Sequence, residues 1–186
     1  MTASHSNPAT AWPRWRVFPP VALGVIMATL DASVVNIALP TLQRVLHAPL
    51  STVTWIALAY SLTITGGLLA AGRFADARGR KRVYGMGLIG FTVASLLCGL
   101  APNAGVLIAL RVVQGLFAAL VSANGSALLV QAFPAEERGR ALGAFGAMVG
   151  LGLAFGSPLG GFVIAHASWR WIFFANLPLG LYAASL

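Results

Sequence analysis

Two charged side chains, Asp31 and Arg111, stand inside long apolar stretches of this 186-residue chain. An ionised carboxylate midway along a membrane-spanning helix costs about 2.5 to 3.5 kcal/mol on insertion scales, and few structural roles justify that cost. If Asp31 faces a cavity, it could take up and release a proton as solvent access alternates. A carboxylate held by neighbouring polar groups or placed at an interface is the alternative. We favour proton coupling.

Arg111 lies five residues into its stretch, so its charged end could reach the outer interface. Gln114 is on nearly the same helical face, and the two side chains could instead present a polar patch to a cavity. The guanidinium keeps its proton at ordinary pH, which leaves the roles of counter-ion, substrate contact or tuning of a carboxylate. Asp31 is the obvious electrostatic partner. Asn36 could line the same cavity or hydrogen-bond across helices.

Residues 72–82 form the most densely charged segment, which we interpret as a loop between two helices. Membrane orientation explains its basic residues, but it does not explain Asp76 or the bracketing glycines Gly72 and Gly79. Asp76 can accept hydrogen bonds from arginines or from a helix N-terminus. The segment therefore predicts a breakable latch between two conformations.

The composition predicts that most of the chain lies within a lipid bilayer. Hydrophobic residues make up 58% and charged residues only 9%, with a mean hydropathy of +0.83, whereas about a quarter of a soluble domain is charged. Disordered and disulfide-rich secreted proteins are excluded. The net charge of +8 does not predict nucleic-acid binding, because the charges cluster at the ends of apolar runs. Cys98 stands alone and the histidines are scattered, so no metal site is expected.

Charges divide the chain into runs of membrane-crossing length, for which a helix needs about twenty residues. The runs are continuous rather than alternating, which excludes barrel strands and predicts an all-α polytopic membrane protein. We predict a tail over residues 1–16 and a six-span bundle over 17–186, ending inside the sixth span with the C-terminal half absent. The predicted spans are 17–39, 54–71, 83–101, 106–130, 141–165 and 171–186.

The positive residues are unevenly shared between alternate loops, and cytoplasmic loops carry the excess of Lys and Arg. One side has Arg14, Arg16, Arg73, Arg78, Arg80, Lys81, Arg82, Arg138 and Arg140. The other side has only Arg44 and Arg170. The N-terminus is therefore predicted to be cytoplasmic.

Glycine recurs every four residues in the fifth span, first at Gly146 and Gly150 and then at Gly152, Gly156 and Gly160. This spacing puts small surfaces on one helical face and lets a neighbouring backbone approach closely. We expect a packing helix.

Four segments match motifs of one transporter family. Leu30–Pro40 resembles L-D-x-T-V-V-N-V-A-L-P, Gly72–Arg82 resembles G-x-L-A-D-R-x-G-R-K-x, Arg111–Gly115 resembles R-x-x-Q-G, and Trp169–Gly180 resembles the entry to span six. The departures are Ser33, Phe74 and Ala77. In this order, the motifs resemble the N-terminal half of a major facilitator superfamily transporter, specifically the drug/proton antiporters of the fourteen-span branch.

A fifth motif of these antiporters, G-x-x-x-G-P-x-x-G-G, is imperfect. Gly152, Gly156, Gly160 and Gly161 match it, but the proline is displaced by one residue to Pro158. The displacement turns a proline kink by about 100° around the helix. The glycine packing is expected to survive, and the motif then says little about transport direction.

The resemblance implies that Asp31 is the protonation site coupled to export and that Arg111 assists proton transfer. It also implies a cytoplasmic latch that closes against the C-terminal half. The latch residues are Gly72, Arg73, Asp76, Arg78, Gly79 and Arg80. We expect export of small amphipathic compounds across the bacterial cytoplasmic membrane by alternating access, driven by the proton gradient without a cofactor.

Two alternatives differ in class. The chain could be a truncated or self-assembling six-span protein that transports nothing. An intramembrane protease is disfavoured, because Ser126 directly follows Gly125 and His166 lies at a span end. No phosphate-binding glycine loop is present to support ATP-driven transport, and we expect no enzyme activity.

Overall fold

The computed structural model describes residues 14–185, which form helices joined by short turns, with no strand among them. The helices are η2 (Arg14–Arg16), α1 (Phe18–Val45), α2 (Leu50–Arg78), α3 (Arg80–Gly99), α4 (Ala104–Ala132), α5 (Ala135–His166), α6 (Trp171–Phe174) and α7 (Asn176–Ser185). Helices α1 to α5 are long and apolar enough to cross a membrane. The predicted all-α class is confirmed. Residues 1–13 of the predicted tail lie outside the described residues.

The helices extend past most of the predicted span boundaries. Helix α2 has 29 residues and α5 has 32, because both continue through charged residues that we had taken as span ends. Arg, Lys and Glu are good helix formers, so a charge ends the apolar run without ending the helix. The sixth predicted span is divided, since α6 ends at Phe174 and α7 begins at Asn176.

The interpretation of residues 72–82 as a loop is wrong. Helix α2 runs to Arg78 and α3 begins at Arg80, so Gly79 is the only residue between them. Gly79 has φ of 91°, which glycine adopts at little cost because it lacks a Cβ. Gly72 lies inside α2 and does not bracket the turn.

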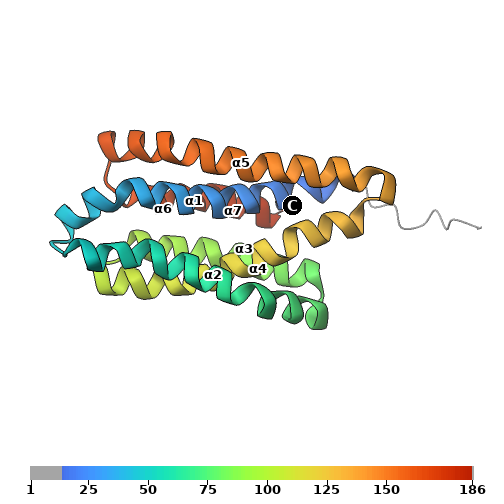
Figure 1. Ribbon diagram of the computed structural model, residues 1–186, viewed down its shortest axis with the longest axis horizontal. Helices are drawn as coiled ribbons and strands as arrows, with labels where there is room; N and C mark the ends of the chain where they lie inside the picture. The colour runs from blue at the N-terminus through green and yellow to red at the C-terminus, as the bar shows by residue number, and fades with distance from the viewer. Residues whose placement is uncertain (1–13, 186) are drawn as a thin grey trace, which may run out of the picture.

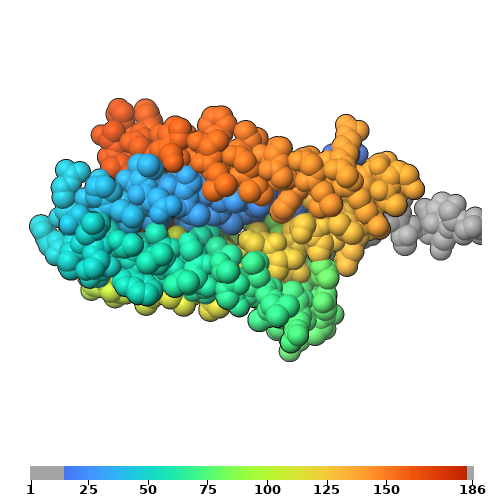
Figure 2. All heavy atoms as spheres, viewed as in Figure 1, coloured from blue at the N-terminus to red at the C-terminus, as the bar shows by residue number. Residues whose placement is uncertain are grey.

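The bundle is elongated, and its long helices lie along one common direction (Figure 1). The most extensive packing joins α2 to α4, α1 to α5 and α3 to α4, with α7 against α3 and α1. Figure 2 shows α1 between α5 and α2 on one face of the molecule. The most apolar windows of α2 and α5 are only 22% and 17% buried, against 44% or more in the other three spans. Helices α2 and α5 therefore present the largest unpacked faces.

Three glycines of α5 allow it to lie against α1. A Cβ at Gly152 would collide with Thr29, one at Gly156 with Ser33, and one at Gly160 would lie 2.9 Å from Val34. The predicted close packing therefore holds for Gly152, Gly156 and Gly160. Pro158 lies inside α5 and does not end the helix.

The remaining glycines of α5 do not belong to this packed face. An added Cβ at Gly146, Gly150 or Gly161 meets nothing within 4 Å among the described residues. Gly150 is two residues from Gly152 and therefore lies about 200° around the helix from it. Gly161 is one residue from Gly160 and lies about 100° from it. Our single-face prediction is wrong for Gly146 and Gly150. Gly161, which we included through the family motif, also lies off the packed face.

Two arginines bind the carboxyl ends of neighbouring helices at opposite ends of the bundle. Arg170 donates to the carbonyls of Gly99 and Ala101 at 2.6 and 3.1 Å, where α3 ends. Arg138 donates to Val130 and Phe133 at 3.0 and 3.1 Å, where α4 ends. Basic side chains satisfy the last carbonyls of a helix in this way. These contacts fix how α3 and α4 meet the elements that follow them.

Candidate functional site

Asp31 and Arg111 meet in the interior of the bundle. Asp31 on α1 is 1% exposed and Arg111 on α4 is 0% exposed. Nη1 of Arg111 donates to Oδ2 of Asp31 across the α1–α4 interface. Arg111 therefore does not extend to the outer interface, and the alternative that it binds Asp31 is confirmed.

The guanidinium of Arg111 has partners besides the carboxylate. Its Nε donates to the Ile56 carbonyl at 3.1 Å and its Nη1 donates to Oε1 of Gln114 at 2.7 Å. Its Cζ lies 3.9 Å from the centre of the Tyr60 ring, an attractive cation–π position. Tyr60 is fixed by a 3.1 Å hydrogen bond to the Ala28 carbonyl. The cation is thus held by α2 and α4 as well as by Asp31.

The second carboxylate oxygen of Asp31 accepts two amide donors. Gln114 Nε2 and Asn176 Nδ2 lie 3.1 and 3.2 Å from Oδ1 of Asp31. Both amides also reach Ser95 Oγ on α3, at 2.8 and 3.4 Å. Charge-assisted donors of this kind are stronger than neutral ones. Five helices, α1 to α4 and α7, therefore contribute to one polar network around Asp31.

Apolar side chains enclose the network at both of its ends. Met27 and Phe91 belong to a buried cluster with Tyr60, and Val35 and Phe173 belong to another with Cys98. All of these side chains are at most 2% exposed. In this conformation Asp31 faces no open cavity, and neighbouring polar groups hold it, which is the arrangement we weighed as the alternative. The carboxylate is therefore closed off from solvent in this conformation.

Asn36 does not join the network. Its side chain is exposed and donates to the Ala32 carbonyl of its own helix at 3.1 Å. Five residues separate it from Asp31, which turns it about 140° around α1. Gln114, which we expected to form a polar patch with Arg111 toward a cavity, does contact Arg111 but is 0% exposed and lines no open cavity in this conformation.

Sequence reasoning missed Ser95, Asn176 and Tyr60 as members of the network. Asn176 could have been found, because it is a lone polar residue in the apolar run that carries the Trp169–Gly180 motif. Ser95 and Tyr60 gave no such signal, because both types are common in spans. One acceptor remains open: Oδ1 of the buried Asn176 has no hydrogen-bond partner among the described residues.

The predicted latch is an exposed ion pair. Asp76 Oδ1 accepts from Arg80 Nη2 at 2.7 Å across the Gly79 turn, with side-chain exposures of 60% for Asp76 and 28% for Arg80. Within the described residues no ion pair joins Asp76 to Arg73 or Arg78, and Arg78 instead lies 5.4 Å from the Phe74 ring. In this conformation only the Asp76–Arg80 part of the predicted latch is formed.

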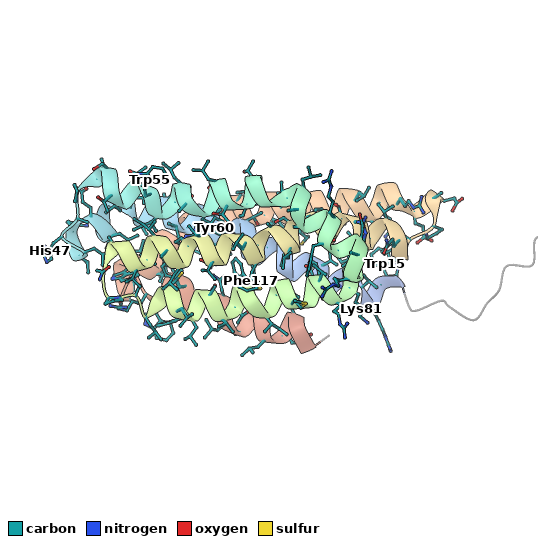
Figure 3. All side chains as sticks on the ribbon, turned by 90° about the horizontal axis from the view of Figure 1, so that it is seen from below. Trp15, His47, Trp55, Tyr60, Lys81 and Phe117 are labelled. Atoms are coloured by element: carbon teal, nitrogen blue, oxygen red, sulfur yellow. The ribbon has the colours of Figure 1, made fainter. Side chains whose placement is uncertain are left out.

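The basic turn lies at the same end of the bundle as the start of α1. Figure 3 shows Trp15 and Lys81 near one end and His47 at the other, as expected for antiparallel neighbours. The Lys- and Arg-rich connections thus gather on one side.

The sequence pattern of the Major Facilitator Superfamily matches residues 21–186. This chain belongs to that superfamily. It is 38% identical over 173 residues to a riboflavin transporter of Clostridioides difficile, covering 93% of this chain and 38% of the relative. It is 41% identical to the puromycin resistance protein of Streptomyces alboniger, covering 91% of this chain and 34% of that protein. The chain therefore spans little more than a third of the length of these relatives.

The fold has a solved counterpart. A bacterial homolog of the human lysosomal transporter Spinster, in an inward-facing and occupied conformation, superposes with a TM-score of 0.78 at 17% identity. The match covers 92% of this chain and 43% of that one. The predicted superfamily fold is thus confirmed. The chain belongs to a family of transporters, as predicted, and not to a family of enzymes.

Proposed function

We propose that this chain is the N-terminal half of a proton-coupled antiporter that exports small amphipathic compounds across the bacterial cytoplasmic membrane. The N-terminus and the basic turn face the cytoplasm, and the proton gradient is the energy source. Names of relatives support export, since they include puromycin, tetracenomycin C and methylenomycin A resistance proteins. The observation that carries the proposal is the buried network around Asp31.

Asp31 is suited to gain and lose a proton because its cationic partner does not depend on it alone. When the carboxylate is neutral, Arg111 still has the Ile56 carbonyl, the Gln114 amide oxygen and the Tyr60 ring. Protonation therefore weakens the tie between α1 and α4 without leaving a bare cation. Among the described residues, Arg111 is the charged group in direct contact with Asp31.

Asn176 supplies a partner for both states of the carboxyl group. Its Nδ2 donates to the ionised Asp31, and its unpartnered Oδ1 lies on the same amide. Rotation of the amide by about 180° would exchange donor for acceptor, so that a protonated Asp31 could donate to Oδ1. Asn176 would thereby couple the protonation state of α1 to the position of α7.

Transport requires the C-terminal half of the same chain. We place substrate near the membrane midplane between the two halves, which rock against each other around it. The faces of α2 and α5 that remain open in this half would receive the second half. The latch residues would close this contact on the cytoplasmic side.

Everted membrane vesicles containing the complete protein test the proposal. We expect proton-dependent accumulation of an amphipathic cation, and of riboflavin as a second probe, to be lost in Asp31→Asn. The matched control Glu136→Gln, which neutralises an exposed carboxylate outside the network and the latch, should keep it. Proton-coupled transport that persists in Asp31→Asn would overturn the coupling role. Transport by the 186-residue chain alone would show that a self-assembling six-span unit suffices, contrary to the proposal.

A further inference from the structure

An open groove of about 780 Å³ lies between α3 and the last turns of α4, separate from the Asp31 network. Arg80, Lys81 and Arg82 line it from the first turn of α3. Met86 and Ile89 line it from the next two turns, and Leu128 lines it from α4. One side of the groove is therefore basic and the other is apolar.

The basic end carries an excess of positive charge. Helix α3 has no acidic residue in its first turn, and its N-cap residue Gly79 provides no side-chain hydrogen bond to the first amides. The positive end of the helix dipole thus adds to the three cations. Asp76 pairs with Arg80, and Arg82 has no ion pair among the described residues. The combination favours an anion.

The apolar end is exposed instead of being filled by the protein. Met86 is 47% exposed and Ile89 is 57% exposed. Gly85 lies between the two ends, and a Cβ there would meet nothing within 4 Å, so the groove is open at this level. Arg82 and Ile89 are seven residues apart, which is about 10 Å along a helix. This distance matches the step from a lipid phosphate to the upper part of its acyl chains.

We propose that this groove binds an anionic phospholipid of the leaflet that the basic end faces. The phosphate lies against Lys81, Arg82 and the first amides of α3, and one acyl chain lies along Met86, Ile89 and Leu128. The charge complementarity selects an acidic headgroup over a zwitterionic one, because basic pockets between spanning helices bind such headgroups. A free phosphate ion would leave the apolar half unused.

Native mass spectrometry of the complete protein in detergent tests the charge requirement. The probes are dioleoyl phosphatidylglycerol and dioleoyl phosphatidylcholine, which have the same acyl chains. An exposed pair between a cation and the lipid phosphate is worth up to about 1 kcal/mol, which is about fivefold in affinity. We therefore expect the double variant Lys81→Gln/Arg82→Gln to lose about 25-fold in phosphatidylglycerol affinity with little change for phosphatidylcholine.

The matched control is Arg16→Gln/Arg140→Gln, which removes the same charge from the same end of the bundle. Arg140 lies over the Trp15 ring, away from the groove. This variant should keep phosphatidylglycerol affinity within about twofold of the unchanged protein. Equal losses in both double variants would mean that net charge alone attracts the lipid, and would overturn the site.

A second variant tests the apolar half without changing charge. Gly85→Leu places a side chain into open groove space and should weaken phosphatidylglycerol binding, while Gly139→Leu, also in open space on α5, should not. Unchanged phosphatidylglycerol binding in Gly85→Leu would show that the apolar half is not used. Displacement of bound phosphatidylglycerol by inorganic phosphate at the same concentration as by free phosphatidylglycerol would show a simple anion site. Either result would overturn the lipid proposal. Neither result depends on whether the protein transports.

Discussion

Asp31–Arg111 and Asp76–Arg80 are two aspartate–arginine pairs with the same chemistry and opposite surroundings. The first pair has side-chain exposures of 1% and 1% and joins residues 80 positions apart. The second has exposures of 60% and 28% and joins residues four positions apart. The buried pair exists only if α1 and α4 dock, whereas the exposed pair forms across a single turn.

The difference shows that an ion pair takes its importance from its surroundings. Removing one partner of a buried pair leaves an uncompensated charge and costs about 3–5 kcal/mol. An exposed pair is worth about 0–1 kcal/mol, because water and salt screen it. The buried pair can therefore respond strongly to protonation, while the exposed pair can open and close at little cost.

The largest expected effect is that of Arg111→Met in the complete protein. The unpaired Asp31 should lower the free energy of unfolding by about 3–5 kcal/mol near neutral pH. The loss should shrink as pH falls, because protonation removes the unpaired charge. Denaturant titration in detergent measures this, with Arg80→Met as the control at about 1 kcal/mol or less. Equal losses in the two variants would contradict the comparison.

Asn176→Ala tests whether the buried pair needs its additional donors. Loss of a hydrogen bond to a charged group should cost about 1.5–3 kcal/mol. The matched control is Asn36→Ala, whose exposed amide contacts only the Ala32 carbonyl of its own helix and should change stability by less than about 0.5 kcal/mol. A larger effect at Asn36 than at Asn176 would reverse the assignment of the site.

Gly156→Val tests whether the position of α1, and with it Asp31, depends on α5. The new side chain would collide with Ser33 and press on the Leu30 carbonyl at 3.2 Å. Overpacking of this kind should cost about 1–3 kcal/mol. Gly150→Val, in open space, is the control within the same helix. Thermal unfolding of both variants measures the difference, and the reverse order would refute the packing role.

Asp76→Asn should have the smallest effect. The change in unfolding free energy should stay below about 0.5 kcal/mol at low salt, since the pair is exposed and within one turn. In 1 M salt the variant and the unchanged protein should coincide, because the screening length falls to about 3 Å. The Arg111→Met loss should persist in the same salt. A salt-resistant Asp76 effect would mean that this pair is buried in the complete protein.

The sequence predicted the helical class, the family and the three central residues of the network. Lone polar residues in apolar runs are costly, so Asp31, Arg111 and Gln114 were conspicuous without any structure. Ser95 could not be found in this way, because burying a serine hydroxyl costs little free energy and serine is common in membrane spans. The latch was located but described as a loop, since charge density marks the end of an apolar run and not the end of a helix.

The sequence alone determined which side chains must avoid lipid and which helix faces could pack closely, because these depend on residue type and helical period. Only the tertiary structure decided which partner each of these side chains and helix faces has. Arg111 could extend to the interface or turn inward, and the docking of α1, α2 and α4 selects the inward position by surrounding it with a carboxylate, a carbonyl and a ring. The same docking separates the packed row at Gly156 from the open glycine at Gly150, because the position of α1 determines which face is covered.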